Sequence, residues 1–216
     1  MGLVCQEKLR YSGAGMPYAR FTFDFEKFIA AVHYLADREI PGLDKYKICK
    51  LLFFADKYHL VRYGRPIIGD RYCPLPHGPI PSRALDLLNN FISSGNEGKK
   101  SEEIEAMSAI LSLEKKYQYP RFTSKRRMTK NERGALSQSD KKALDHVIKE
   151  FGDKGFYELK SLTHADYAYR KATEENLGEM RYEDFFEEDS DAIEGAREQM
   201  LENCQLNRAF PHREEF

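Results

Sequence analysis

Asp56 and His59 are the residues of this chain whose types and spacing most readily suggest chemistry. They lie three positions apart in an apolar stretch, so on a helix they would share one face. Asp70, His77 and His164 could converge on them, and such a group could bind a metal ion or transfer protons. One interpretation is therefore a small metal-dependent hydrolase that uses Asp56, His59 and His164.

The rest of the sequence favours a structural interpretation of the Asp–His pair. It contains no HExxH motif, no CxxC pair and no regular series of His and carboxylate residues, so nothing fixes a coordination number. Buried polar groups are normally hydrogen-bonded. We therefore expect Asp56 and His59 to join their helix to the glycine-rich segment that follows, each satisfied by the other or by backbone groups. We expect no catalysis, no cofactor and no metal.

Composition describes a soluble globular protein with a charged surface. The 216 residues are 41% hydrophobic and 32% charged, and the formal net charge is -1. The cysteines, Cys5, Cys49, Cys73 and Cys204, are too far apart for a zinc ribbon or a disulfide framework, which favours the reducing cytoplasm. No apolar run approaches the length of a membrane span, so we expect no membrane contact.

Most of the chain has helical periodicity. We expect helices from Asp24 to the breaker at Pro41, over 44–63, from Ser82 to about 93, over 101–117, over 139–151, over 157–175 and over 190–204. Strands are confined to RPIIGDRYCPL and KYQYPRFTS, whose prolines exclude a central strand position, and these two could pair. The predicted fold is mainly α: a compact single-domain helical bundle with a minor β element and a Gly/Pro-rich turn.

The segment from Leu51 to Leu88 changes character half-way along. It begins as an apolar helix that we expect to be central and buried, and then becomes rich in glycine and proline. Gly64, Gly69 and Gly78 indicate turns with positive φ or a close approach of the chain. The prolines at 66, 74, 76, 79 and 81 stiffen the path between them. A rigid turn on a helical base is a common place for binding residues.

The residues of this segment resemble the signature of the SocA-like antitoxin family, also called the Panacea domain. The family pattern runs through KLLFFADKYHLVRYGRPIIGDRY and then HGPIPS, and a second block, LKSLTHADYAYRKA, matches its Leu-Thr-His element. The matching positions to which the resemblance assigns a structural role are Lys50, Phe54, Asp56, His59, Gly64, Pro66, Gly69, Gly78, Pro81, Thr163 and His164. The family usually has a tryptophan shortly after that histidine, whereas this chain has no Trp and Tyr169 takes the position.

The resemblance implies an antitoxin from a bacterial or phage toxin–antitoxin pair. Such a protein binds a cognate protein toxin encoded by an adjacent gene, and at least some members also deliver the toxin to a cytoplasmic AAA+ protease. No catalytic residues are implied. The resemblance covers about residues 24–175, which we take as the domain. Residues 1–23 would then be an N-terminal arm, and 176–216 an acidic C-terminal helix and tail that pack on the domain or extend it.

Charge is segregated along the chain. From Lys115 to Arg133 there are eight basic residues and one acid, whereas 174–202 is rich in acids. The basic block could touch nucleic acid as a DNA-binding autoregulator, but it has no helix-turn-helix pattern, so we do not expect nucleic acid as a partner. The acidic block contains aromatics and resembles a protein-binding surface. The predicted partner-binding residues are therefore Asp70, Tyr72, His77, Pro79, Ser82, Tyr182, Phe185, Phe186, Glu187 and Glu188.

Overall fold

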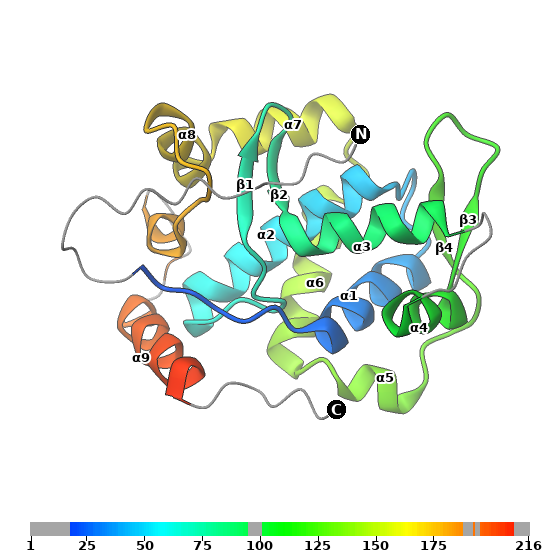
Figure 1. The fold of residues 1–216 in the computed structure, drawn as a ribbon, viewed down its shortest axis with the longest axis horizontal. Coiled ribbons are helices and arrows are strands. Elements are labelled where there is room, and N and C mark those ends of the chain that lie inside the picture. Colours follow the sequence, from blue (N-terminus) through cyan, green and yellow to red (C-terminus); the bar gives the residue numbers. More distant parts are fainter. Residues whose placement is uncertain (1–17, 95–100, 188–191, 193–194, 210–216) are drawn as a thin grey trace.

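A computed structural model describes residues 18–94, 101–187, 192 and 195–209. The described chain is mainly helical with two small antiparallel sheets, which confirms the predicted fold class (Figure 1). In order, the elements are α1 (Phe25–Asp37), α2 (Lys45–Tyr63), β1 (Tyr72–Leu75), β2 (Gly78–Pro81), α3 (Ser82–Ser93), α4 (Glu102–Ile110), β3 (Leu111–Glu114), β4 (Arg121–Ser124), α5 (Lys130–Gly134), α6 (Gln138–Phe151), α7 (Phe156–Ala165), α8 (Tyr167–Glu174), the 3-10 helix η1 (Tyr182–Phe186) and α9 (Ala196–Ala209).

Helix α2 is the centre of the molecule, as its apolar pattern predicts. Asp44 begins it by accepting a hydrogen bond from Lys47 N, and Gly64 ends it in the left-handed conformation. Its buried residues lie on most sides, because α1, α3, α6, α7 and α9 all pack against it. Helix α2 therefore positions most of the elements that surround it.

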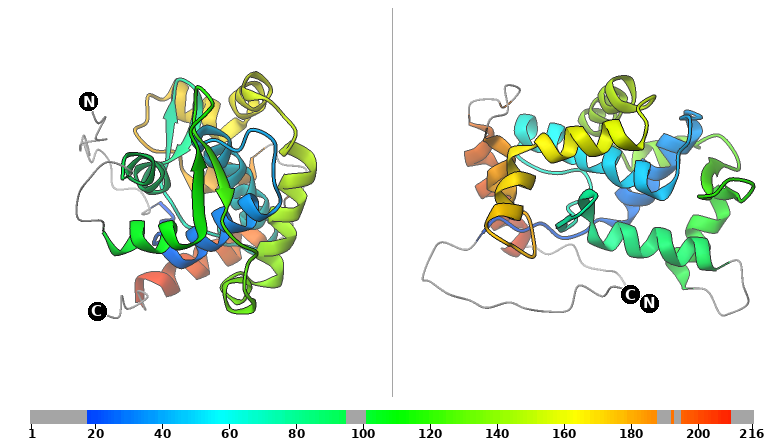
Figure 2. Two further views of the ribbon diagram at one scale, coloured as in Figure 1. Left: turned by 90° about the vertical axis from the view of Figure 1, so that its right-hand side faces the viewer. Right: turned by 90° about the horizontal axis from the view of Figure 1, so that it is seen from above.

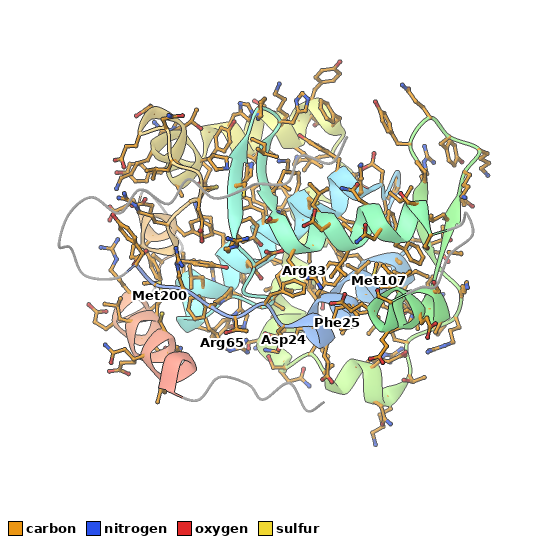
Figure 3. All side chains as sticks on the ribbon, viewed as in Figure 1. Asp24, Phe25, Arg65, Arg83, Met107 and Met200 are labelled. Carbon is orange, nitrogen blue, oxygen red and sulfur yellow. The ribbon has the colours of Figure 1, made fainter. Side chains whose placement is uncertain are left out.

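Two hydrophobic cores lie on either side of α2. The larger joins α1, α2, α3, α4 and α6. The smaller core joins α2 to β1, α8, η1 and α9, and it includes Phe53, Tyr72 and Phe185. Figure 3 marks one methionine of each core, Met107 of α4 and Met200 of α9.

The smaller core holds both ends of the described chain. Ala19 N donates to Glu183 Oε1 at 2.6 Å, and Cys204 Sγ lies 3.0 Å from both Arg20 N and Arg20 O. Residues 19–21 therefore contact η1 and α9, and α9 packs on α2. Met200 and Cys204 of α9 belong to the smaller core. Residues 1–17 of the predicted arm lie outside the described residues.

The strands differ from the predicted pairing. β1 pairs with β2 within the Gly/Pro-rich segment, with Tyr72 opposite Pro81, and β3 pairs with β4 elsewhere, with Leu111 opposite Ser124. The two predicted strand segments thus belong to different sheets. The helix predicted over 101–117 was too long, because its second half forms β3.

Two glycines of the Gly/Pro-rich segment allow close approach of the chain. Gly69 has φ +66°, and a Cβ there would lie 2.6 Å from Thr22 O. Gly78 has φ +96°, and a Cβ would lie 2.5 Å from Thr163 Oγ1. Both values fall in the region that only glycine adopts easily, which confirms the predicted positive φ.

The longest of the described helices, α2, has 19 residues and includes several Lys and Arg side chains. None of the helices in the described ranges combines the length and the apolar character that crossing a membrane requires.

Candidate functional site

Asp56 fixes the segment after α2 to the helix itself. Its Oδ1 accepts hydrogen bonds from Ile67 N at 2.8 Å and Ile68 N at 3.0 Å, and its Oδ2 accepts one from Tyr72 Oη at 3.0 Å. The carboxyl is completely buried, and burial raises its pKa to about 7 even though the three donors favour the charged form. Asp56 therefore holds residues 67–72 against α2 through three hydrogen bonds.

His59 belongs to a second network. Its Nδ1 donates to Arg65 O at 2.7 Å, while Nε2 lies 2.9 Å from Ser139 Oγ and 3.1 Å from Asp140 Oδ1. Asp140 is also 3.0 Å from Arg65 Nη2. Burial of Asp140 raises the pKa of its carboxyl, but the hydrogen bond from His59 and the positive charges of Arg65 and Lys27 lower it by more. The pKa of Asp140 therefore lies well below its usual range.

These two networks test the predicted Asp–His pair. Both residues tie α2 to the glycine-rich segment, as predicted, but their partners are backbone groups and other side chains rather than each other. His164 lies on α7 beside Tyr169, with ring centroids 4.6 Å apart. Within the described ranges, no group of three or more His, Cys, Asp and Glu side chains is arranged to hold a metal ion.

Asp70 anchors the start of α3. It is buried, and its carboxylate accepts from Arg71 N at 2.7 Å, Arg83 N at 3.0 Å and Ala84 N at 2.8 Å. Burial raises its pKa, against the effect of these N–H groups. Helix α3 begins at Ser82, as expected, but Pro81 precedes it and makes no side-chain cap, so the remote Asp70 supplies the cap.

Several predicted partner-binding residues are not available at the surface. Asp70, Tyr72 and Pro79 are buried, and the aromatics Tyr182 and Phe185 are only 5% and 1% exposed. The prediction that these side chains form an exposed surface was therefore wrong. Tyr72, Tyr182 and Phe185 fill the smaller core, whereas Asp70 caps α3 and Pro79 lies over Lys50.

The remaining members of that predicted set have varied positions. Phe186 is half-buried beneath the Arg197 guanidinium, and Glu187 pairs with the same arginine. Ser82 is half-buried and His77 is exposed. Glu188 lies outside the described residues.

One exposed surface does involve the predicted turn. It consists of Leu75, Pro76 and His77 at the tip of the β1–β2 hairpin and of Phe156 and Tyr157 at the start of α7, and we call it the hairpin–α7 face (Figure 1). The His77 and Phe156 rings meet edge to face, with centroids 5.7 Å apart. Tyr157 is 83% exposed, which is unusual for a large aromatic side chain.

Buried and half-buried groups hold the hairpin tip in place from below. Tyr46 Oη donates to His77 O at 2.9 Å, and its ring lies 4.4 Å from that of Phe156. Tyr169 Oη donates to Leu75 O at 2.9 Å, so the tyrosine in the position of the family tryptophan is buried and contributes a hydrogen bond to the hairpin.

Lys50 lies directly beneath the hairpin. It is completely buried, and its Nζ donates to Pro79 O at 2.7 Å. A Cβ on Gly78 would lie 2.7 Å from this Nζ and 2.5 Å from Thr163 Oγ1, so hairpin, α2 and α7 meet where only glycine fits. Burial lowers the pKa of Lys50 to about 7.

Sequence reasoning missed Tyr46, Phe156 and Tyr157. The sequence did contain an indication of the two α7 aromatics. The helix FYELKSLTHA has apolar residues in addition to those on the face that buries Leu159 and Thr163. Surplus apolar residues on an otherwise polar helix indicate an interaction surface.

Comparison with known proteins assigns the chain to a family. The model of the antitoxin SocA-like Panacea domain matches residues 48–170, more than half of the chain. No curated protein and no solved structure gives a significant match. The matched range contains Lys50, Asp56, His59, Gly78 and Thr163, and thus all the networks that hold the β1–β2 hairpin on α2 and α7. The chain belongs to the SocA-like antitoxin family with a Panacea domain.

Proposed function

We propose that this chain neutralises a cognate protein toxin by binding it directly, and that the hairpin–α7 face makes the contact. The observation that carries the proposal is the exposure of apolar side chains on two elements that meet through His77 and Phe156: Leu75 on the hairpin is 40% exposed, and Phe156 and Tyr157 on α7 are 42% and 83% exposed. Contiguous exposed apolar groups mark interaction sites, and aromatic residues are the most frequent interface anchors. Membership of an antitoxin family supports a toxin as the partner.

The backbone beneath the face supports the same proposal. Leu75 and His77 each have their carbonyl oxygen held by a tyrosine hydroxyl, and Pro79 has its carbonyl held by Lys50. A surface that is already ordered loses little conformational freedom when a partner docks. More of the contact free energy then appears as affinity.

The experiment expresses the product of the adjacent gene in cells, alone and together with this chain. The adjacent gene product should stop growth, the wild-type chain should restore it, and the two proteins should co-purify. Tyr157→Asp should abolish rescue and co-purification, because it places a charge in the centre of an apolar contact. Immunoblots of the toxin during rescue separate steric inhibition, in which toxin persists, from proteolytic delivery, in which it disappears.

A control variant tests whether a charge at any exposed apolar position would abolish rescue. Leu206→Asp on α9 changes another exposed apolar residue, 57% exposed and on a different element, and should leave rescue intact. Both variants need melting curves like that of the wild-type protein. Full rescue by Tyr157→Asp would show that the hairpin–α7 face is not used, and absence of any complex with the wild-type chain would contradict the proposed function itself.

A further inference from the structure

The basic block of the sequence follows consecutive elements along one edge of the molecule. Residues 115–133 hold eight of the chain's 34 Lys and Arg but only one of its 35 Asp and Glu, so this segment carries +7 in a chain of net charge -1. It forms the loop between β3 and β4, then β4 itself, and continues to α5. In Figure 2 (left) the β3–β4 hairpin stands at the front of the molecule, and Figure 1 shows it well away from the β1–β2 hairpin.

Few of these cations are neutralised by acids. Arg126 pairs with Glu132 at 2.6 Å, Arg127 with Asp37 at 3.3 Å, and Lys116 approaches Glu114 at 3.9 Å. Within the described ranges, five other cations of the block have no carboxylate oxygen within 4.0 Å, namely Lys115, Arg121, Lys125, Lys130 and Arg133. Their charge is therefore available to a partner.

A track of two adjoining hollows follows the block. One groove, with a volume of about 590 Å³, lies between the end of α1 and β4. Arg121, Lys125, Arg126 and Arg127 line it, together with Asp37, Glu39 and Glu114 at its α1 and β3 sides. A second hollow of about 590 Å³ shares Arg127 with the first and adds Arg133. The cations thus follow a path rather than a point, which fits a polymer with repeated negative charge.

Aromatic rings at the hairpin loop give this path a second property. The Arg121 guanidinium lies 3.4 Å from the centroid of the Tyr117 ring, and Tyr119 is 61% exposed nearby in the same loop. A flat exposed ring beside cations is suited to stacking with an unpaired base, since every base has a π face. An acidic polypeptide would use the cations but has no need of the exposed tyrosine.

The sequence alone did not lead us to expect nucleic acid as a partner, but the arrangement of these cations and rings changes that interpretation. We propose that the β3–β4 hairpin and its groove bind single-stranded nucleic acid. Phosphates would lie along Arg121, Lys125 and Arg133, and a base would stack on Tyr119. Bases in a duplex are already stacked and paired, so the tyrosine favours a single strand over a double one. This activity is independent of toxin binding, because it uses a different edge of the molecule.

The test measures binding of the full chain to fluorescently labelled 20-nucleotide single-stranded RNA, single-stranded DNA and duplex DNA, with labelled polyglutamate as an acidic polypeptide. We expect binding to one or both single strands that weakens as salt rises, because contacts with phosphates release counterions. The preference between RNA and DNA identifies which single strand is bound. Tyr119→Ala should weaken single-strand binding at least fivefold and leave polyglutamate binding unchanged.

Charge variants complete the test. The double variant Lys125→Glu/Lys130→Glu should reduce single-strand binding at least tenfold, whereas Lys142→Glu/Lys149→Glu, which reverses two exposed cations of α6, should have little effect. All variants are compared with the wild type by melting curve. Equal binding of polyglutamate and RNA with no effect of Tyr119→Ala would overturn the proposal in favour of an acidic protein partner. No binding at low salt, or binding that the Lys125/Lys130 change leaves intact, would also overturn it.

Discussion

Replacing Lys50 with methionine should change how the stability of the protein depends on pH. The Lys50 side chain is completely buried, its Nζ donates to Pro79 O, and it lies 4.9 Å from the centroid of the Tyr46 ring. Within the described part of the chain, no carboxylate lies within 4.0 Å of this Nζ to compensate a positive charge. Burial therefore lowers the pKa of Lys50 from 10.5 to about 7.

The direction of the effect follows from the protons bound in each state. In the unfolded chain the Lys50 amine keeps its proton up to about pH 10.5, whereas in the folded protein it loses the proton near pH 7. Between these values the unfolded state binds more protons, so stability rises with pH. Below pH 7 both states are protonated, and the folded state bears the whole cost of a buried charge. The titration of Lys50 alone should therefore raise the unfolding free energy of the wild-type protein by roughly 2–3 kcal/mol between pH 6 and pH 9.

The assay is urea unfolding of the wild-type and Lys50→Met proteins at pH 6, 7, 8 and 9, at constant ionic strength and with a reductant. The measured quantity is the unfolding free energy of the variant minus that of the wild type. Methionine leaves Pro79 O without its donor, but this loss lowers the unfolding free energy of the variant by a similar amount at every pH. It therefore does not change how the difference depends on pH. The difference should fall by roughly 2–3 kcal/mol from pH 6 to pH 9.

The control variant is Lys142→Met, which removes one exposed amine from α6. It separates the loss of a buried amine from the loss of one charge in the whole protein. A Lys50→Met difference that does not change with pH would refute the argument, because it would mean that folding does not alter the protonation of Lys50.

Three further stability measurements test the networks around the hairpin. Gly78→Ala should lower the urea-unfolding free energy by roughly 2–4 kcal/mol, because the new Cβ would meet Thr163 and the backbone has positive φ. The control, Gly134→Ala, has open space around the new Cβ and should be nearly neutral. Asp140→Asn should lower the unfolding free energy by about 3 kcal/mol at neutral pH. The pKa of Asp140 is low only in the folded state, so the difference between variant and wild type should shrink as the pH falls below about 4, which acid unfolding curves measure. Asp70→Ala should lower the unfolding free energy by roughly 1–3 kcal/mol, because α3 loses its cap, and Asp70→Asn should restore part of that free energy. Equal stability of Asp70→Ala and the wild type would contradict the capping role of Asp70.

The local signals of the sequence predicted the helical frame well. Asp24 and Asp44 do begin α1 and α2, and the apolar residues of α2 are buried on most sides. These predictions succeed because a cap and a helical face depend on residues only a few positions apart. The overrun of the 101–117 helix has the opposite cause: Leu111 and Leu113 pair with β4, and that partner is not visible in a local period.

The candidate site was predictable only in part. The turn that holds His77 was identified, since glycines and prolines mark it directly. Tyr182 and Phe185 were misplaced because a stretch of aromatics and acids reads the same whether it faces water or packs on Phe53. The exposure of Tyr157 likewise depends on which side of α7 meets α2, and that is a property of the assembled fold.

Burial separates the family motif from the exposed tip of the β1–β2 hairpin. Lys50, Asp56 and His59 are completely buried, and each holds a backbone group of the segment between α2 and α3. A substitution among them would disturb the frame rather than one contact, because a buried partner would be left unsatisfied. Leu75 and Tyr157, in contrast, are exposed and lie outside the motif positions, so they can change without loss of a buried hydrogen bond. The motif residues therefore hold the hairpin on α2, whereas side chains at the exposed tip and at the start of α7 can vary without disturbing these hydrogen bonds.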